Sequence, residues 1–442
     1  MLLALLDCRK RLETWEKALS KSLIVRGPLA GLSLVLAAGL ALPVPAALAG
    51  PAFDACAAAA ASQYEPGFET IGRETWDIDT TKAIELCSKA LREEPDSAQV
   101  KGWLARAYFA NGDTEDAVPL FEEASAGGHV VALAIYGDML TTGDGVDQDM
   151  ERGAQLLTEG AEAGFAMAQN SLGLSYDFGE GVEQDYTEAA RWYRAAAEQG
   201  MPKAQSNLGL MYQDGLGVPR DYVAAAAWFE RAVDQGDPSA QVNLGKVLQD
   251  GLGQKADPER AVELYTLAAN QGDRFGQNNL GFMLENGIGT EVDLEAAAEN
   301  YRLAADQGMA LAKHNLALLY EDGRGVKQNY KEALDLYTEA AEGGEMRAAV
   351  NLGLLYLDGL GTDVNYDEAL HWTQIAADAG QPIGLNNLGH IYENGLGVTA
   401  DLDLAKSYYQ AAADQGYQLA VDNLARLNAG GTTPAVGKTK TK

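Results

Sequence analysis

The chain has 442 residues, of which 47% are hydrophobic but only 8% aromatic, and its formal net charge is −31 at pH 7. This length exceeds one compact core, and the recurring alanine pairs favour thin helical layers stacked in one elongated array. The acidic surface repels phosphate, which disfavours nucleic acid and anionic lipid headgroups as partners.

Residues 1–49 have the features of a signal peptide. Lys21 and Arg26 precede an apolar run, and residues 47–49 (Ala-Leu-Ala) form a cleavage pattern before Gly50. Cleavage after residue 49 predicts a periplasmic protein, with secretion or display on the cell surface as the alternative. An uncleaved membrane anchor is the competing interpretation, because residues 27–50 carry no charge and are long enough to span a bilayer.

Cleavage removes Cys8 and leaves Cys56 and Cys87, an even number in a compartment that permits disulfides. We expect one disulfide between them, closing a loop of about thirty residues. It would tie residues 50–80, an irregular N-terminal cap, to the first helical hairpin. Two buried thiols that behave as small hydrophobes are the alternative.

From residue 130 onward a pattern repeats every 36 residues, for example at Leu172-Gly173 and Leu208-Gly209. In each unit, apolar residues at i, i+4 and i+8 predict a first helix, and a Gly-x-Gly turn ends it. An N-cap then starts a second helix; the caps are Asp149, Asp185, Asp221, Asp257, Asp293, Asn329, Asn365 and Asp401. Glu188, Glu332 and Glu368 follow three residues later and predict capping boxes. Such hairpins must stack on their neighbours, which predicts an all-α solenoid with eight repeats over 130–417.

The pattern Ala-x-x-Asn-Leu-Gly-x-x-Tyr, then Gly-x-Gly-Val-x-x-Asp, then Ala-x-x-Trp-Tyr-x-x-Ala-Ala-x-x-Gly resembles the Sel-one-like repeat (SLR) family. It is most complete at 204–236. Residues 81–129 resemble a tetratricopeptide (TPR) hairpin, with Leu104, Ala105 and Tyr108 at the Leu-Gly-x-x-Tyr positions. The resemblance implies a right-handed superhelix of helix-turn-helix repeats. We expect residues 418–428 to form a C-terminal capping helix and 429–442 a disordered tail.

No motif predicts catalysis, a cofactor or a metal site. The four histidines, at 129, 314, 371 and 390, lack zinc-ligand spacing, and no Lys-Ser/Thr follows the Gly-x-Gly turns as a phosphate-binding loop needs. Residues 143–149 are rich in aspartate but lack the EF-hand order. Cysteine-rich SLR members for which β-lactam binding or hydrolysis has been proposed carry a Cys pair in each repeat, whereas no Cys follows Cys87 here. We therefore expect that the chain is not an enzyme.

In TPR-like hairpins, first-helix residues outside the packing stripe line the concave wall. Transferring that geometry predicts a partner groove at Phe275, Asn278, Phe282, His314, Leu318, Glu321, Leu354 and His390. An apolar strip with an acidic rim suits a basic or amphipathic protein segment. The competing interpretation is that the leucines fill space between repeats and the acids solvate the turns.

The SLR resemblance implies a scaffold or regulatory adaptor that binds proteins, and we expect the chain to be a monomer. A glycan- or peptidoglycan-binding envelope protein is the main alternative, but it would favour exposed aromatic side chains, and Trp192, Trp228 and Trp372 fall at packing positions of the repeat. A β-lactamase-like enzyme is the remaining alternative.

Overall fold

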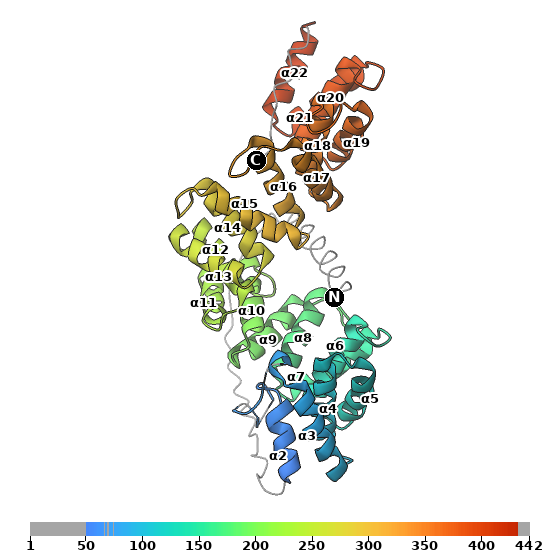
Figure 1. Cartoon of the computed structure of the whole chain (residues 1–442), viewed down its shortest axis with the longest axis vertical. Helices are drawn as coiled ribbons and strands as arrows, with labels where there is room; N and C mark the ends of the chain where they lie inside the picture. Colours follow the sequence, from blue (N-terminus) through green and yellow to red (C-terminus); the bar gives the residue numbers. More distant parts are fainter. Residues whose placement is uncertain (1–49, 66, 69, 74, 432–442) are drawn as a thin grey trace, which may run out of the picture. The chain divides into compact units, whose positions relative to one another are not determined.

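The computed structural model describes residues 50–431 apart from 66, 69 and 74, so the expected signal peptide and most of the expected tail lie outside the described part. Within it the chain is an all-α solenoid (Figure 1), and Ser62 and Arg73 form an isolated β-bridge. None of the helices in this part is long and apolar enough to cross a membrane.

The N-terminal helices are α2 (Pro51–Ala60), η1 (Thr75–Asp77), α3 (Thr80–Glu93), α4 (Ala98–Asn111) and α5 (Thr114–Ala126). The first helices of the repeats, called A helices, are α6 (Val130–Thr142), α8 (Ala166–Phe178), α10 (Pro202–Asp214), α12 (Pro238–Asp250), α14 (Arg274–Asn286), α16 (Ala310–Asp322), α18 (Met346–Asp358), α20 (Pro382–Asn394) and α22 (Gln418–Asn428). The second helices, called B helices, are α7 (Met150–Glu162), α9 (Tyr186–Glu198), α11 (Tyr222–Val233), α13 (Pro258–Asn270), α15 (Leu294–Asp306), α17 (Tyr330–Glu342), α19 (Tyr366–Asp378) and α21 (Leu402–Asp414). Each α-helix packs on the next α-helix in chain order.

The predicted N-caps of the B helices are confirmed. All eight side chains accept a backbone N–H from the first turn of their helix, as Asp185 does from Thr187 and Glu188. The predicted capping boxes are wrong, because the backbone N–H of the cap already donates to an A-helix carbonyl, at 2.9 Å from Asp185 N to Tyr176 O. Glu188 pairs with Arg191 instead.

The Gly-x-Gly turn also joins adjacent repeats. Its first glycine, Gly215 after α10, has a φ of 72° and ends the helix in the left-handed region. The second, Gly217, has a φ of 64°, and a Cβ there would collide with the carbonyl oxygen of Tyr186. Tyr186 begins helix α9 of the preceding repeat, so this glycine lets the turn lie directly on that helix.

In most repeats a glycine of the A helix faces a large ring of the B helix, although Gly137 faces Leu157 and Gly353 faces Thr373. Gly173 of α8 lies against the ring of Tyr193 on α9, and Gly245 lies against Tyr265 in the same way. Both tyrosines are 1% exposed, so the absent Cβ makes the space in which the ring is buried. The core is therefore a series of thin layers, one for each repeat, as the alanine-rich composition predicts.

A disulfide between Cys56 and Cys87 joins α2 to α3, with their Cα atoms 4.6 Å apart, which confirms the predicted bridge. Both cysteines are fully buried among Ala60, Ala83 and Trp103. The bridge holds α2 against the first hairpin.

Candidate partner-binding surface

Positions 2, 6, 9 and 13 of an A helix, counted from its first residue, share one helical face because they lie 4, 3 and 4 residues apart. We call this face the A-helix stripe. On α12 it comprises Ser239, Asn243, Lys246 and Asp250, and all but Asn243 are exposed. The remaining faces of an A helix pack on its own B helix and on the adjacent repeats.

On α14 the stripe carries two exposed aromatic rings. Phe275 is 37% and Phe282 is 41% exposed, at positions 2 and 9. The guanidinium carbon of Arg274 lies 5.1 Å from the centre of the Phe275 ring, a cation–π contact. The stripe of α14 therefore presents apolar area to solvent, seven residues apart along one helix.

Three further predicted groove residues occupy position 9 of later A helices. Leu354 on α18 and His390 on α20 are half-buried, whereas Leu318 on α16 is 7% exposed. Leu318 belongs to a core cluster with Tyr337 and Leu352. It fills space between repeats, so the expected apolar strip is interrupted at α16.

Asn278 and His314 connect adjacent A helices and are not accessible. Asn315 of α16 donates through Nδ2 to Asn278 Oδ1 of α14 at 3.1 Å. One repeat later, His314 takes the place of Asn278, and its Nε2 lies 3.5 Å from Nδ2 of Asn351 on α18. Asn278 is 4% and His314 is 0% exposed. Both side chains hold neighbouring repeats together, and neither contributes to a partner surface.

Glu321 is a buried acceptor and does not form an acidic rim. The hydroxyl of Tyr337 on helix α17 donates to its Oε2 at 2.8 Å, and Glu321 is 7% exposed. Burial and the adjacent carboxylate raise the pKa of Tyr337 well above its ordinary value of 10, so the hydroxyl remains a donor. Glu393 and Tyr409 repeat the arrangement, also at 2.8 Å. Each tyrosine–carboxylate bond holds together the two helices of one hairpin, and Glu393 also pairs with Arg426 of α22, with Nη2 2.7 Å from Oε2.

The stripe is nearly neutral although the chain is strongly acidic. From α8 to α20 its charged members are three cations, Lys203, Lys246 and Arg347, and four acids, Asp214, Asp250, Asp322 and Asp358. Most of the acidic residues behind the charge of −31 therefore lie on other surfaces. The four acids all lie at position 13, at the ends of their helices, and the three cations at positions 2 and 9 nearly balance them.

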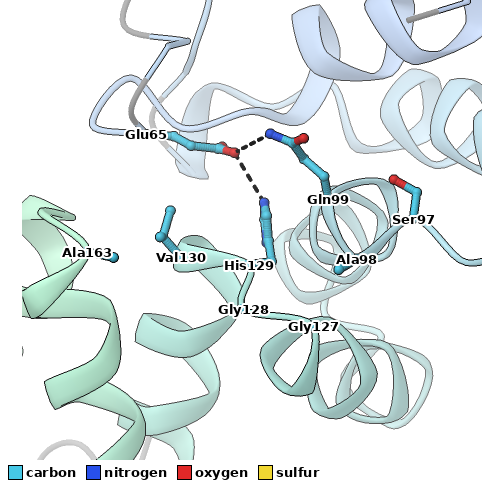
Figure 2. Close-up of a pocket in the computed structure, with 9 residues that line it drawn as sticks. All are labelled: Glu65, Ser97, Ala98, Gln99, Gly127, Gly128, His129, Val130 and Ala163. Carbon is cyan, nitrogen blue, oxygen red and sulfur yellow. Dashed lines mark hydrogen bonds and ion pairs between the residues drawn. The ribbon is translucent and has the colours of Figure 1, made fainter. Parts of the chain in front are cut away.

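A cavity of about 470 Å³ lies beside the starts of α4 and α6 (Figure 2). Its lining residues are Glu65, Ser97, Ala98, Gln99, Gly127, Gly128, His129, Val130 and Ala163. Figure 2 shows Glu65 pointing toward Gln99 and His129. His129 Nε2 lies 3.1 Å from Glu65 Oε1, and both side chains are buried.

Glu65 is held as a carboxylate by its neighbours. Burial acts to raise its pKa, but hydrogen bonds from His129, from the Trp103 indole and from the backbone of Ser62 outweigh burial and hold the pKa below its ordinary 4.5. His129 is also the N-cap of α6, because its Nδ1 accepts the backbone N–H of Ala132 at 3.4 Å. Its ring proton therefore lies on Nε2 and is donated to Glu65.

Sequence reasoning missed this pair, since Glu65 lies in an irregular segment and His129 was tested only as a zinc ligand. Helix α4 corresponds to an A helix, because Leu104 and Ala105 hold the same positions on it as Leu172 and Gly173 on α8. The signal available in the sequence was Trp103 and Arg106 at stripe positions 6 and 9 of α4, where large side chains need a cover. Across residues 50–431, leaving out the three gaps, no three His, Cys, Asp or Glu side chains are grouped to hold a metal ion.

The Sel1 repeat family profile matches the chain eight times, at 130–165, 166–201, 202–237, 238–273, 275–309, 310–345, 347–381 and 382–417. A tetratricopeptide repeat profile matches residues 79–129. No curated protein matches the chain.

Two solved structures share the fold over most of their length. A Sel1 repeat protein from Oxalobacter formigenes is 32% identical with a TM-score of 0.52, and the match covers 70% of this chain and 89% of that one. A protective antigen of uropathogenic Escherichia coli with an SLR fold is 28% identical with a TM-score of 0.51, covering 84% of this chain and 86% of that one. Together with the repeat matches, these similarities show that the chain belongs to the Sel1 repeat family.

Proposed function

We propose that this chain is a non-catalytic interaction scaffold that binds protein partners on the A-helix stripe, centred on Phe275 and Phe282. Neither phenylalanine is required by the packing of the repeat. The same positions hold Ser239 and Lys246 in the preceding repeat, whose fold is the same. Exposed aromatic area that a fold does not need is typical of a binding surface.

The partner segment that we propose for this face binds through apolar contacts with the two phenylalanine rings and does not depend on basic residues. The stripe is nearly neutral, and Glu321, an acid expected in the groove, accepts a hydrogen bond from a tyrosine hydroxyl, as Glu393 does two repeats later. The aromatic pair and the polar side chains around it resemble the apolar centre and polar rim of protein interfaces. This replaces the expectation of a basic amphipathic segment.

The proposed compartment is the periplasm, with the chain acting there as a monomer. The Cys56–Cys87 disulfide supports an oxidising environment. Mass spectrometry of the protein from a periplasmic fraction tests the location, with Gly50 expected as the first residue. Recovery of the uncleaved chain in the membrane fraction would contradict cleavage.

Affinity capture from the native cell envelope tests the binding face. The variant Phe275→Ser/Phe282→Lys copies the residues of the preceding repeat, so it should fold normally and lose partner recovery. The control Leu267→Lys/Leu303→Lys removes comparable exposed apolar area, 45% and 40% exposed, from B helices α13 and α15. Equal recovery by the wild-type chain and the phenylalanine variant would reject the proposal.

A further inference from the structure

Residues 61–73, here called the strap, follow α2, and those that the structure describes (all but 66 and 69) include several that contact the stripe of α4. Arg106, at position 9, donates through Nη1 to the carbonyls of Ala60 and Ala61 at 2.8 and 2.9 Å. Its Nη2 donates to the carbonyl of Arg73 at 2.7 Å. One stripe cation thus binds main-chain oxygens at both ends of the strap.

Strap side chains complete the contact at position 6. Trp103 donates its indole N–H to Glu65 Oε2 at 2.9 Å. Its ring meets Phe68 edge to face, with the centroids 5.0 Å apart. The strap therefore contacts the stripe through main-chain carbonyls, one carboxylate and one aromatic ring.

The strap buries a face that is open elsewhere. Trp103 is 0% and Arg106 is 1% exposed, whereas Lys246, at position 9 of α12, is exposed. Tyr64 extends the contact, packing against core clusters that include residues of α6, α8 and α9. The disulfide fixes α2 at one end and α3 follows at the other, so both ends are tethered and the strap occupies its site at high effective concentration.

On α12 and α14 the stripe matches α4 at position 9, where Lys246 is exposed, whereas position 6, the place of Trp103, holds Asn243 and Asn279. Two exposed phenylalanine rings on α14 supply the aromatic surface instead. Lys246 is in the register of Arg106 and offers ammonium donors to carbonyl or carboxylate oxygens. Phe275 and Phe282 follow one repeat later and offer ring surfaces to an aromatic side chain. The exposed cation and the aromatic pair lie on adjacent A helices that contact each other.

We propose that the stripe of α12 and α14 binds an extended partner segment in the way that the stripe of α4 binds the strap. Oxygens of the segment face Lys246, and an aromatic side chain packs against Phe282 and Phe275. This rests on the proposed function, because it names the binding mode and the partner chemistry of the same face. The partner is a flexible protein segment with an acidic residue and an aromatic residue a few positions apart, as Glu65 and Phe68 are in the strap.

A labelled synthetic peptide with the sequence of residues 61–73 is the probe, and fluorescence anisotropy with the purified full chain is the readout. Saturable binding is expected, and a peptide of scrambled sequence should not bind. Lys246→Ala and Phe282→Ser should each weaken binding at least about five-fold, as loss of one charge-assisted hydrogen bond or one aromatic contact predicts. Lys255→Ala, which removes an exposed lysine from the turn after α12, is the matched control and should bind as the wild type does.

A photocrosslinking residue in place of Phe68 of the peptide locates the site. Crosslinks on α12 and α14 support the proposal. Crosslinks on α4 would mean that the peptide has displaced the strap and would overturn it, as would absent binding or affinities unchanged by Lys246→Ala and Phe282→Ser. If the peptide fails these tests but partner recovery from the envelope still requires Phe275 and Phe282, only the proposed binding mode is wrong. If the peptide binds as expected but partner recovery does not depend on Phe275 and Phe282, the proposed function is wrong.

Discussion

His314 should make the contact between two adjacent repeats sensitive to acid. It lies at position 5 of α16, fully buried, with its ring 5.8 Å from that of Tyr337 and beside Asn351 of the next repeat. Burial lowers its pKa from 6.5 to about 4; Glu345 opposes this shift and Arg347 adds to it. Between these pH values the unfolded chain binds a proton that the folded chain does not bind.

The size of the effect follows from the two pKa values. At pH 7 the imidazole is mainly neutral in the folded and in the unfolded chain, so its titration hardly changes the free energy of unfolding. As the pH falls from 6.5 to about 4, the free energy of unfolding decreases, and it levels off below that range. A difference of about 2.5 pKa units corresponds to at most roughly 3 kcal/mol.

The variant His314→Asn isolates this contribution. Asparagine occupies the equivalent position 278, where it accepts a hydrogen bond from Asn315 at 3.1 Å, so the contact between repeats should be retained without a titrating group. Urea unfolding of both proteins at several pH values between 7 and 4 is the assay, with local hydrogen exchange in α16 and α18 as a second readout. The wild type should lose up to roughly 3 kcal/mol more than the variant over this range.

The difference between the two proteins removes the contribution of the many carboxylates that titrate in the same range. His371→Asn, at an exposed position of α19, controls for the loss of a histidine. Parallel pH profiles for the wild type and His314→Asn would refute the reasoning.

Three further changes test the packing by thermal or chemical unfolding. Gly217→Ala should destabilise the chain by at least about 2 kcal/mol more than Gly200→Ala. Both glycines have a positive φ, but only a Cβ at position 217 would collide with the preceding repeat, so equal losses would contradict the prediction. Tyr337→Phe should cost about 1–3 kcal/mol by removing the donor to a buried carboxylate, and an unchanged midpoint would argue against that bond. Replacing Cys56 and Cys87 by serine should cost about 3–4 kcal/mol, seen first as faster hydrogen exchange in α2 and α3 and little change in α16, whereas uniform change along the chain would contradict a local role.

The sequence by itself determined the repeat register and the ends of the helices. Asp185 accepts N–H groups two and three residues away, and Gly215 ends its helix through its own φ, so each signal acts within one turn of the chain. Interactions this local recur wherever the pattern recurs. The predicted capping boxes failed because a contact outside the motif competes with them. The backbone N–H of Asp185 donates to the carbonyl of Tyr176 on the preceding A helix, which the four residues of the motif do not include.

Only the tertiary structure decided which polar side chains remain accessible. Glu321 and Tyr337 are 16 residues apart, and His314 and Asn351 are 37 apart, so their burial depends on a B helix and on the next repeat. The strap depends on contacts of the same kind, with 38 residues between Glu65 and Trp103. Periodicity identifies a helical face, but packing across repeats determines whether that face meets solvent, a neighbouring helix or the chain itself.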